Sequence, residues 1–433
     1  MAKTCKFLLE YREVIKEMNI DFDNCTPPKR TMKRFVHLLK EISDVRVQGM
    51  IDYPLEEIIV IVFLAVLGNA STWNEVTTFG MVKRKWLNKF LKLEHGIPSH
   101  DTFERVFGLI DSIELEAVTV AFLSENIDKI RKALRTGKGQ KKLICIDGKE
   151  EKGTGRKYGT AEEVRNLQTL HVYDASYGIC LFSEIIDEKT NEIPVAQRIL
   201  ASIELKDAVC TFDALHTQKK TIGIIVKQKG DYVGALKDNH EIFETEVASL
   251  FSEDYKKSIQ KKGKNYLETV EKAHNRIETR KFYLTTDVKW FEDLKEWEKL
   301  KSFVCYEKTS VDMVTEKETY EVRYYIASLT DIELCADAIR GHWSIENRLH
   351  WHLDADFHED DNSTMNKNAF NNLSIINKMV LSLMKLAKPI VGDNSIRVLR
   401  KQFGWGLEEN LSKLLNAFDD KTLIEAIANA NKK

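Results

Sequence analysis

Short apolar runs rich in β-branched residues, separated by helical stretches, constrain the fold of this chain more than any other feature. They have the length and composition of buried strands, and they occupy residues 142–147, 169–175, 178–186, 208–214 and 231–237. Helical patterns at 193–205 and 217–230 separate several of them. Alternation of strand and helix predicts an α/β fold with a partly parallel sheet and crossover helices.

Different patterns flank this α/β segment. Residues 31–136 have a helical pattern, in which Pro54 lies near a helix start and Gly68 near its end. Residues from about 240 to 330 alternate as antiparallel strands do, and helix resumes after 331. We therefore expect an N-terminal tail or linker at 1–30, a helical domain at 31–136, an α/β domain at 140–390 with a β-rich insertion at about 240–330, and a helical C-terminal tail at 391–433.

Composition limits the class of protein. Lys and Arg (65) nearly balance Asp and Glu (67), so any affinity for nucleic acid must come from local clusters of charge. The cysteines (7) are scattered without a C-x-x-C pair, which argues for reduced thiols and against a disulfide framework or zinc ribbon. The longest apolar run, 58–68, is too short to cross a bilayer. We expect a cytoplasmic protein without a membrane partner.

Two aspartates follow apparent central strands directly. Asp147 follows the run at 142–146, and Asp213 follows the run at 208–212. In open α/β sheets the carboxyl ends of the strands are where ligands bind, so both residues are candidate site residues. The structural alternatives are a turn at Asp147-Gly148 and a helix cap at Asp213.

A glutamate lies in an unusual segment, "HWSIENRLHWHLDADFHEDD", at 342–361. On a helix that turns about 100° per residue, Glu346 is predicted to lie in the middle of the apolar face, between His342 and His350. A carboxylate there is costly unless it is paired or binds a metal. The alternatives are a buried ion pair and a zinc site formed with the two histidines, although the spacing is not H-E-x-x-H.

Asp147, Asp213 and Glu346 could together hold two Mg²⁺ ions, with Mn²⁺ able to substitute. Magnesium prefers hard oxygen ligands and keeps several waters, so few protein carboxylates suffice. Two such ions about 4 Å apart can activate the attacking oxygen and stabilise the leaving oxygen at a phosphodiester. The pattern thus indicates a candidate phosphoryl-transfer site.

Several segments resemble one known family, the DDE transposases of bacterial insertion sequences, in the group that includes the H-repeat-associated proteins. They occur in the family's order and carry the resemblance together: "GIPSHDTFERVF" (96–107), "CIDGKEEKGT" (145–154), "EKTNEIP" (188–194), "TFDALHTQ" (211–218), "GDYVGALKDNHEIF" (230–243), "HNRIETRKFY" (274–283) and "GHWSIENRLHWHLDADFHEDD" (341–361). The resemblance implies a ribonuclease H-like catalytic core with a β-strand insertion between the second Asp and the Glu. It maps Asp147, Asp213 and Glu346 onto the catalytic triad that binds two divalent cations.

This resemblance implies an enzyme that cuts the ends of an element and joins them to target DNA. The expected partners are the terminal repeats, target DNA and a second copy of the chain, because bringing two ends together needs at least a dimer. We expect the helical segment at 31–136 to be a DNA-binding domain that recognises the terminal repeats, and residues 140–390 to form the catalytic domain. Two other functions remain open: a DNA-binding descendant with a decayed site, and a metal-dependent nuclease that does not join strands. Metal-dependent nicking and strand-transfer products would separate the three.

Basic side chains in the expected insertion are candidate DNA contacts. At strand spacing, His274, Arg276 and Arg280 share one face with Glu278. We expect that row to contact phosphates, and we expect further DNA contacts from Lys149, His342 and His350. A supporting role beside the triad is predicted for Asn347, Asp354 and Asp356, the two aspartates by holding nearby basic residues.

Overall fold

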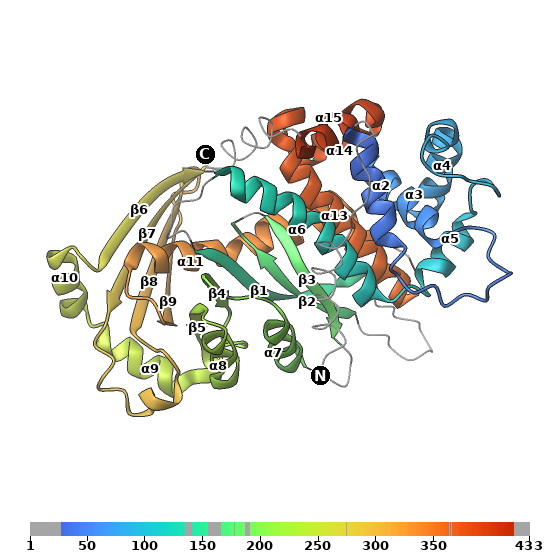
Figure 1. The fold of residues 1–433 in the computed structure, drawn as a ribbon. Helices are drawn as coiled ribbons and strands as arrows, with labels where there is room; N and C mark the ends of the chain where they lie inside the picture. Colours follow the sequence, from blue (N-terminus) through green and yellow to red (C-terminus); the bar gives the residue numbers. More distant parts are fainter. Residues whose placement is uncertain are drawn as a thin grey trace, which may run out of the picture.

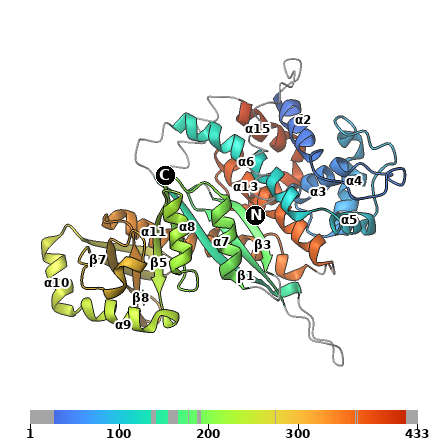
Figure 2. The same cartoon turned by 60° about the horizontal axis from the view of Figure 1, so that its bottom comes forward.

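The structure is a computed structural model that describes residues 27–419 except 135–140, 155–165, 177, 187–190, 274, 363 and 365. Almost all of the expected tail at 1–30 lies outside the described residues, as does His274. Within the described part, a large mixed sheet extends from a helical body to a β-rich end formed by its last strands (Figure 1). The same arrangement is seen after rotation (Figure 2).

One nine-stranded sheet runs through the molecule in the order β3-β2-β1-β4-β5-β9-β8-β7-β6. β1 is antiparallel to β2 and parallel to β4, and β4 is parallel to β5. β9 then pairs antiparallel with β5 and carries the sheet into the β-rich end. The strands are β1 (Lys142–Glu151), β2 (Leu167–Asp174), β3 (Ile179–Ile186), β4 (Ala208–Phe212), β5 (Asp231–Leu236), β6 (Tyr266–Ala273), β7 (Arg276–Thr285), β8 (Ser302–Asp312) and β9 (Glu318–Ala327).

One face of the sheet is covered by helices that connect its strands. Residues such as Ile146 and Phe212 of the strands share a core with Ile199 and Ile225 of these helices. Burial of this apolar area is the main force that holds the crossover helices on the sheet. The helices on this side are α7 (Glu192–Ser202), α8 (Lys219–Lys227) and α9 (Glu241–Leu250), and α10 (Glu253–Lys262) packs against β6 and β7.

The opposite face is covered by helices from later in the chain. α11 (Ile332–Ile345) packs its Ile339 against Val209 and Val233 of the central strands. It continues through a π-helix (Glu346–His350) into α12 (Trp351–Ala355). α13 (Lys367–Val391) packs against β3 farther along the sheet.

Helices from both ends of the chain share a single core, although the sequence suggests separate units. α13 packs against the N-terminal helices, and Phe35, Phe63 and Met384 belong to the same buried cluster. The N-terminal helices are α2 (Pro27–Leu39), α3 (Leu55–Leu67), α4 (Trp73–Leu87), α5 (His100–Phe107) and α6 (Ser112–Leu134), and those at the other end are α13, α14 (Ile396–Trp405) and α15 (Leu407–Asp419).

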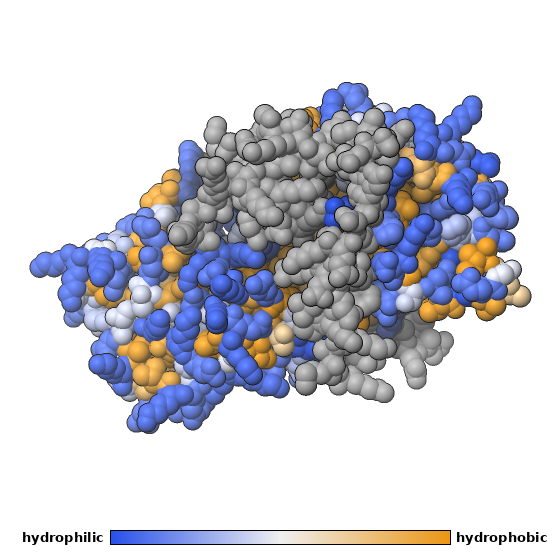
Figure 3. Space-filling view, in the orientation of Figure 1, coloured by the Kyte–Doolittle hydropathy of each residue, from blue (hydrophilic) through white to orange (hydrophobic). Residues whose placement is uncertain are grey.

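On the face drawn in Figure 3, the described residues are mostly hydrophilic, with apolar side chains interspersed. Exposed apolar residues include Met50, Met81 and Trp405 of the helical body. Among the described helices, none combines the length and the apolar character needed to cross a lipid bilayer.

Candidate active site

Asp147 and Asp213 lie side by side at the centre of the sheet. Ile146 of β1 is paired with Phe212 of β4 in parallel register, so the next residue of each strand is an aspartate. Asp213 follows the end of β4, as expected. Asp147 does not end its strand, which corrects the sequence prediction: β1 continues to Glu151 by pairing with β2 alone. The two carboxylates therefore lie where β1 extends beyond β4.

Glu346 returns to these aspartates from a distant part of the chain. It begins the π-helix after α11, and its charge is among the influences that raise the pKa of Asp147. Burial of Ile345, Leu349 and Leu353 fixes this segment against the core. The prediction that Glu346 is buried in the apolar face is wrong, because the residue is exposed to solvent. The segment also departs from the α-helix on which that prediction rests.

Electrostatics at Asp147 favour a bound cation. Burial raises the pKa of Asp147 to about 7, and the neighbouring charges of Asp213, Glu346 and Glu192 add to this rise. The backbone N–H of Gly148 donates a hydrogen bond to Oδ1 of Asp147 at 3.0 Å, and this bond lowers the pKa of Asp147. Crowded carboxylates repel one another unless a cation lies among them. The donor set, all hard oxygens, fits Mg²⁺ or Mn²⁺.

Two histidines expected to contact DNA lie beside the carboxylates as neutral rings. His350 Nδ1 is 3.9 Å from Asp147 Oδ2, and its Nε2 shares a hydrogen bond of 3.1 Å with Nδ1 of His171. Burial lowers the pKa of His350 to about 3 and that of His342 to about 4. At neutral pH these side chains carry no charge, so any contact with a phosphate would be a hydrogen bond from the ring.

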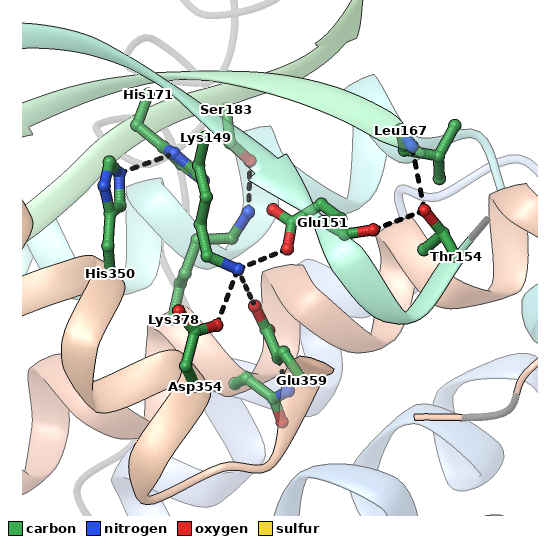
Figure 4. Close-up of polar contacts among 11 residues, drawn as sticks. Lys149, Glu151, Thr154, Leu167, His171, Ser183, His350, Asp354, Glu359 and Lys378 are labelled. Carbon is green, nitrogen blue, oxygen red and sulfur yellow. Dashed lines mark hydrogen bonds and ion pairs between the residues drawn. The ribbon is translucent and has the colours of Figure 1, made fainter. Parts of the chain in front are cut away.

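Lys149 does not have the exposed position that its predicted DNA contact requires. Its side chain is only 6% exposed, and its Nζ forms ion pairs with Glu151, with Asp354 (2.8 Å) and with Glu359 (3.7 Å) (Figure 4). Burial alone would lower the pKa of Lys149, but the carboxylates of Glu359 and Glu151 outweigh it and raise the pKa. A phosphate could reach this ammonium only if these ion pairs opened.

The ion pairs of Lys149 include two members of an acidic cluster. Carboxylate oxygens of Glu151, Asp354 and Asp360 lie within 4.8 Å of one another. Because the Lys149 ammonium pairs with two of these residues, the cluster already has a cation of its own. The cluster and Lys149 therefore join β1 to α12 and to the segment that follows it.

The predicted supporting residues differ in their surroundings. Asp354 pairs with Lys149, and Asp356 accepts from His352 Nδ1 at 2.7 Å and pairs with Arg397 at 3.3 Å. Asn347 donates to the backbone carbonyl of Trp343 at 3.1 Å, within its own helix. The two aspartates thus contact basic side chains, whereas Asn347 makes a local bond.

The predicted row of DNA contacts lies at the tip of the β6–β7 hairpin. Arg276 begins β7, and its side chain is 60% exposed and 3.9 Å from Asp312. Arg280 is only 15% exposed and pairs with Glu278 and with Glu271 (2.8 Å). Arg276 is therefore the more accessible of the two described residues.

Sequence reasoning missed two residues beside the aspartates. Glu192 is in the first turn of α7, and His216 is in the turn after Asp213. Their segments, "EKTNEIP" and "TFDALHTQ", contribute to the resemblance, but neither residue has a chemical pattern around it that marks a function. Only the folded chain brings them together.

The fold and site define an α/β protein with a cluster of carboxylates where the parallel pairing of β1 and β4 ends. The family described as "Transposase DDE domain" matches residues 138–383, and one described as "DDE_Tnp_1-associated" matches 36–123. The chain belongs to the DDE transposases, in the group that includes the H-repeat-associated proteins.

Individual relatives support this assignment. "Putative transposase YncI" of Escherichia coli O157:H7 is 30% identical over 373 residues, which cover 84% of this chain and 90% of the relative. "H repeat-associated putative transposase YhhI" of E. coli K12 is 26% identical over 360 residues, covering 82% and 90%. Among solved structures, a piggyBac transposase synaptic complex with hairpin DNA aligns with 91% of this chain and 82% of that one, with 11% identity and a TM-score of 0.39.

Proposed function

We propose that this chain is an active transposase that cuts DNA at the ends of an element and joins them to target DNA by two-metal phosphoryl transfer. The observation that carries the proposal is the convergence of Asp147, Asp213 and Glu346. Adjacent strands bring the aspartates together, and a helix more than a hundred residues later brings the glutamate to the same place.

We assign a ribonuclease H-like core to β1–β5. Three antiparallel strands followed in space by two parallel ones, in the order β3-β2-β1-β4-β5, support this assignment. Asp147 lies on β1, the middle strand of that order, and Asp213 directly follows β4, its parallel neighbour. The hairpins β6–β9 then form the insertion between Asp213 and Glu346, and they extend the sheet without interrupting the core.

The triad carboxylates would hold Mg²⁺, or Mn²⁺ in its place. Two bound ions supply Lewis-acid chemistry that activates the attacking oxygen and stabilises the leaving oxygen at a phosphodiester. Asp147 lies in β1 and Asp213 directly follows β4, so the paired strands hold the two residues next to each other. His350, which shares a hydrogen bond with His171, lies 3.9 Å from Asp147 and would help to orient it.

DNA would lie along the hairpin tip and the triad. Exposed Arg276 supplies a positive charge there, and Arg280 and His274 remain predicted contacts. Joining two ends requires two copies of the active site, so we propose that the chain acts as a homodimer on its terminal repeats and target DNA.

The test is a cleavage and joining assay with DNA that contains an element end. The wild-type chain should nick this DNA and form strand-transfer products in Mg²⁺, and Asp147→Ala should do neither. Cleavage without joined products would indicate a nuclease instead. DNA binding without any metal-dependent nicking would indicate a descendant whose site has decayed.

A further inference from the structure

A fourth carboxylate lies against the strand that carries Asp147. An ideal Cβ built on Gly148 would lie 2.8 Å from both Oε1 and Oε2 of Glu192. This contact places the Glu192 carboxylate directly over the backbone next to Asp147. Any residue other than glycine at position 148 would push the carboxylate away, so this close approach requires a glycine.

Glu192 is also connected to the second aspartate. Its Oε2 lies 3.4 Å from Nε2 of His216. His216 belongs to the turn after β4, where its backbone N–H donates to Oδ1 of Asp213 at 3.2 Å. Glu192 is therefore in contact with the residue after Asp147 and with the residue three positions after Asp213.

The buried imidazole of His216 indicates that a polar ligand binds at this position. The residue is 1% exposed, and among the described residues neither ring nitrogen has a hydrogen-bond partner. Buried polar atoms in folded proteins almost always have a partner. Nε2 of His216 has only the Glu192 carboxylate at 3.4 Å, and its Nδ1 has no described partner, so this buried ring is a second sign that a ligand binds here.

Glu192 is the first residue of α7. Among the described residues, it forms no ion pair with a Lys or Arg. Asn191 caps α7 by accepting from the backbone N–H of Ile193 at 3.2 Å, which fixes the turn that starts with Glu192. The side chain of Glu192 is 25% exposed, so it borders both solvent and the buried histidine.

From this geometry we infer that Glu192 is a fourth carboxylate ligand of the divalent metal site, in addition to Asp147, Asp213 and Glu346. The inference rests on the proposed function, since it assumes that the triad binds metal. The Glu192 carboxylate would approach the site from the face of the sheet that α7 covers. Glu346 approaches from the opposite face. An additional carboxylate raises affinity for a hard cation.

The test is a titration of the full chain with Mn²⁺ alone, in which electron paramagnetic resonance measures the free ion. The variants are Glu192→Gln, Glu192→Asp, Asp213→Asn and, as a matched control, Glu150→Gln. Glu150 is an exposed glutamate on the same strand as Asp147. Urea unfolding of each variant establishes that the fold is retained.

We expect Glu192→Gln to raise the Mn²⁺ dissociation constant about tenfold or more, Glu192→Asp to restore part of the affinity, and Glu150→Gln to have no effect. Unchanged affinity in Glu192→Gln with weakened affinity in Asp213→Asn would overturn the assignment of Glu192 and leave the proposed function intact. Unchanged affinity in both variants would show that these carboxylates do not bind the metal, and it would contradict both this inference and the proposed function.

Discussion

Lys385 of α13 donates a hydrogen bond from Nζ to the backbone carbonyl of Arg348, at 2.7 Å. Arg348 lies within the π-helix that begins with Glu346. A π-turn replaces the i→i+4 hydrogen bonds of an α-helix and often marks a functional site. The lysine therefore satisfies a carbonyl of the segment that presents a triad carboxylate.

Removal of this donor should disturb catalysis more than DNA binding. Burial lowers the pKa of Lys385 to about 7, so we expect Lys385→Met to lower stability by about 0.5–1.5 kcal/mol, as for an ordinary hydrogen bond. We also expect it to slow cleavage while DNA affinity stays near the wild-type value. Lys388→Met is the control, since Lys388 is partly exposed and pairs only loosely with Asp393 at 3.8 Å. Equal cleavage rates in both variants would contradict a role of the π-helix in placing Glu346.

The ion pairs of Lys149 should contribute strongly to stability. Removal of one partner leaves buried carboxylates without compensation, so Lys149→Met should lower the free energy of unfolding by about 3–5 kcal/mol. Lys152→Met, at an exposed position nearby, should change it by no more than about 0.5 kcal/mol. Urea unfolding measures both, and similar small effects would show that Lys149 is not held as described.

Glu116 should make stability depend on pH. Burial raises its pKa to about 7, although Lys378 and hydrogen bonds from Ser183 oppose the rise. Because the pKa of the folded state lies above that of the unfolded chain, ionisation costs nothing below about pH 4.5. The cost grows between pH 4.5 and 7, and it is complete above pH 7.

Glutamine at position 116 cannot ionise, so it escapes this cost. We expect the stability of Glu116→Gln relative to wild type to increase between pH 5 and 8, by an amount on the order of 3 kcal/mol. Unfolding curves at the two pH values measure the difference. If the two proteins show parallel pH profiles, the carboxylate does not titrate as described.

Arg276 should bind phosphate without reading sequence. We expect Arg276→Gln to weaken binding to all duplexes similarly and to reduce the slope of log affinity against log salt by about 1. The control is Lys257→Gln, which removes one positive charge from an exposed position on α10. If Arg276→Gln keeps the salt dependence of the wild type, Arg276 does not contact a DNA phosphate.

Local patterns predicted much of the fold. The helix α3 begins after Pro54 and ends before Gly68, as expected, because proline and glycine act on their own part of the backbone. The five core strands were also predicted, since burial on both faces leaves a continuous apolar run. Asp213 follows its strand for the same local reason.

Distant contacts could not be read from periodicity. A lysine in a strand gives no sign that its partners, Asp354 and Glu359, are some two hundred residues away. The helical projection missed the exposure of Glu346, although the residues from Ile339 to Ile345 are α-helical as it assumed. Periodicity alone does not show which part of a helix extends beyond the core. The common core of the first and last helices depends likewise on contacts that no local pattern encodes.

The most direct test of the central claim compares the wild-type chain with Glu346→Gln on end-containing DNA in Mg²⁺, in Mn²⁺ and in EDTA. The proposed function predicts cleavage by the wild type in either metal, none in EDTA, and a loss of at least about a hundredfold in the variant, whose folding and DNA binding stay unchanged. Equal cleavage by both proteins would contradict the assignment of Glu346 to the catalytic triad.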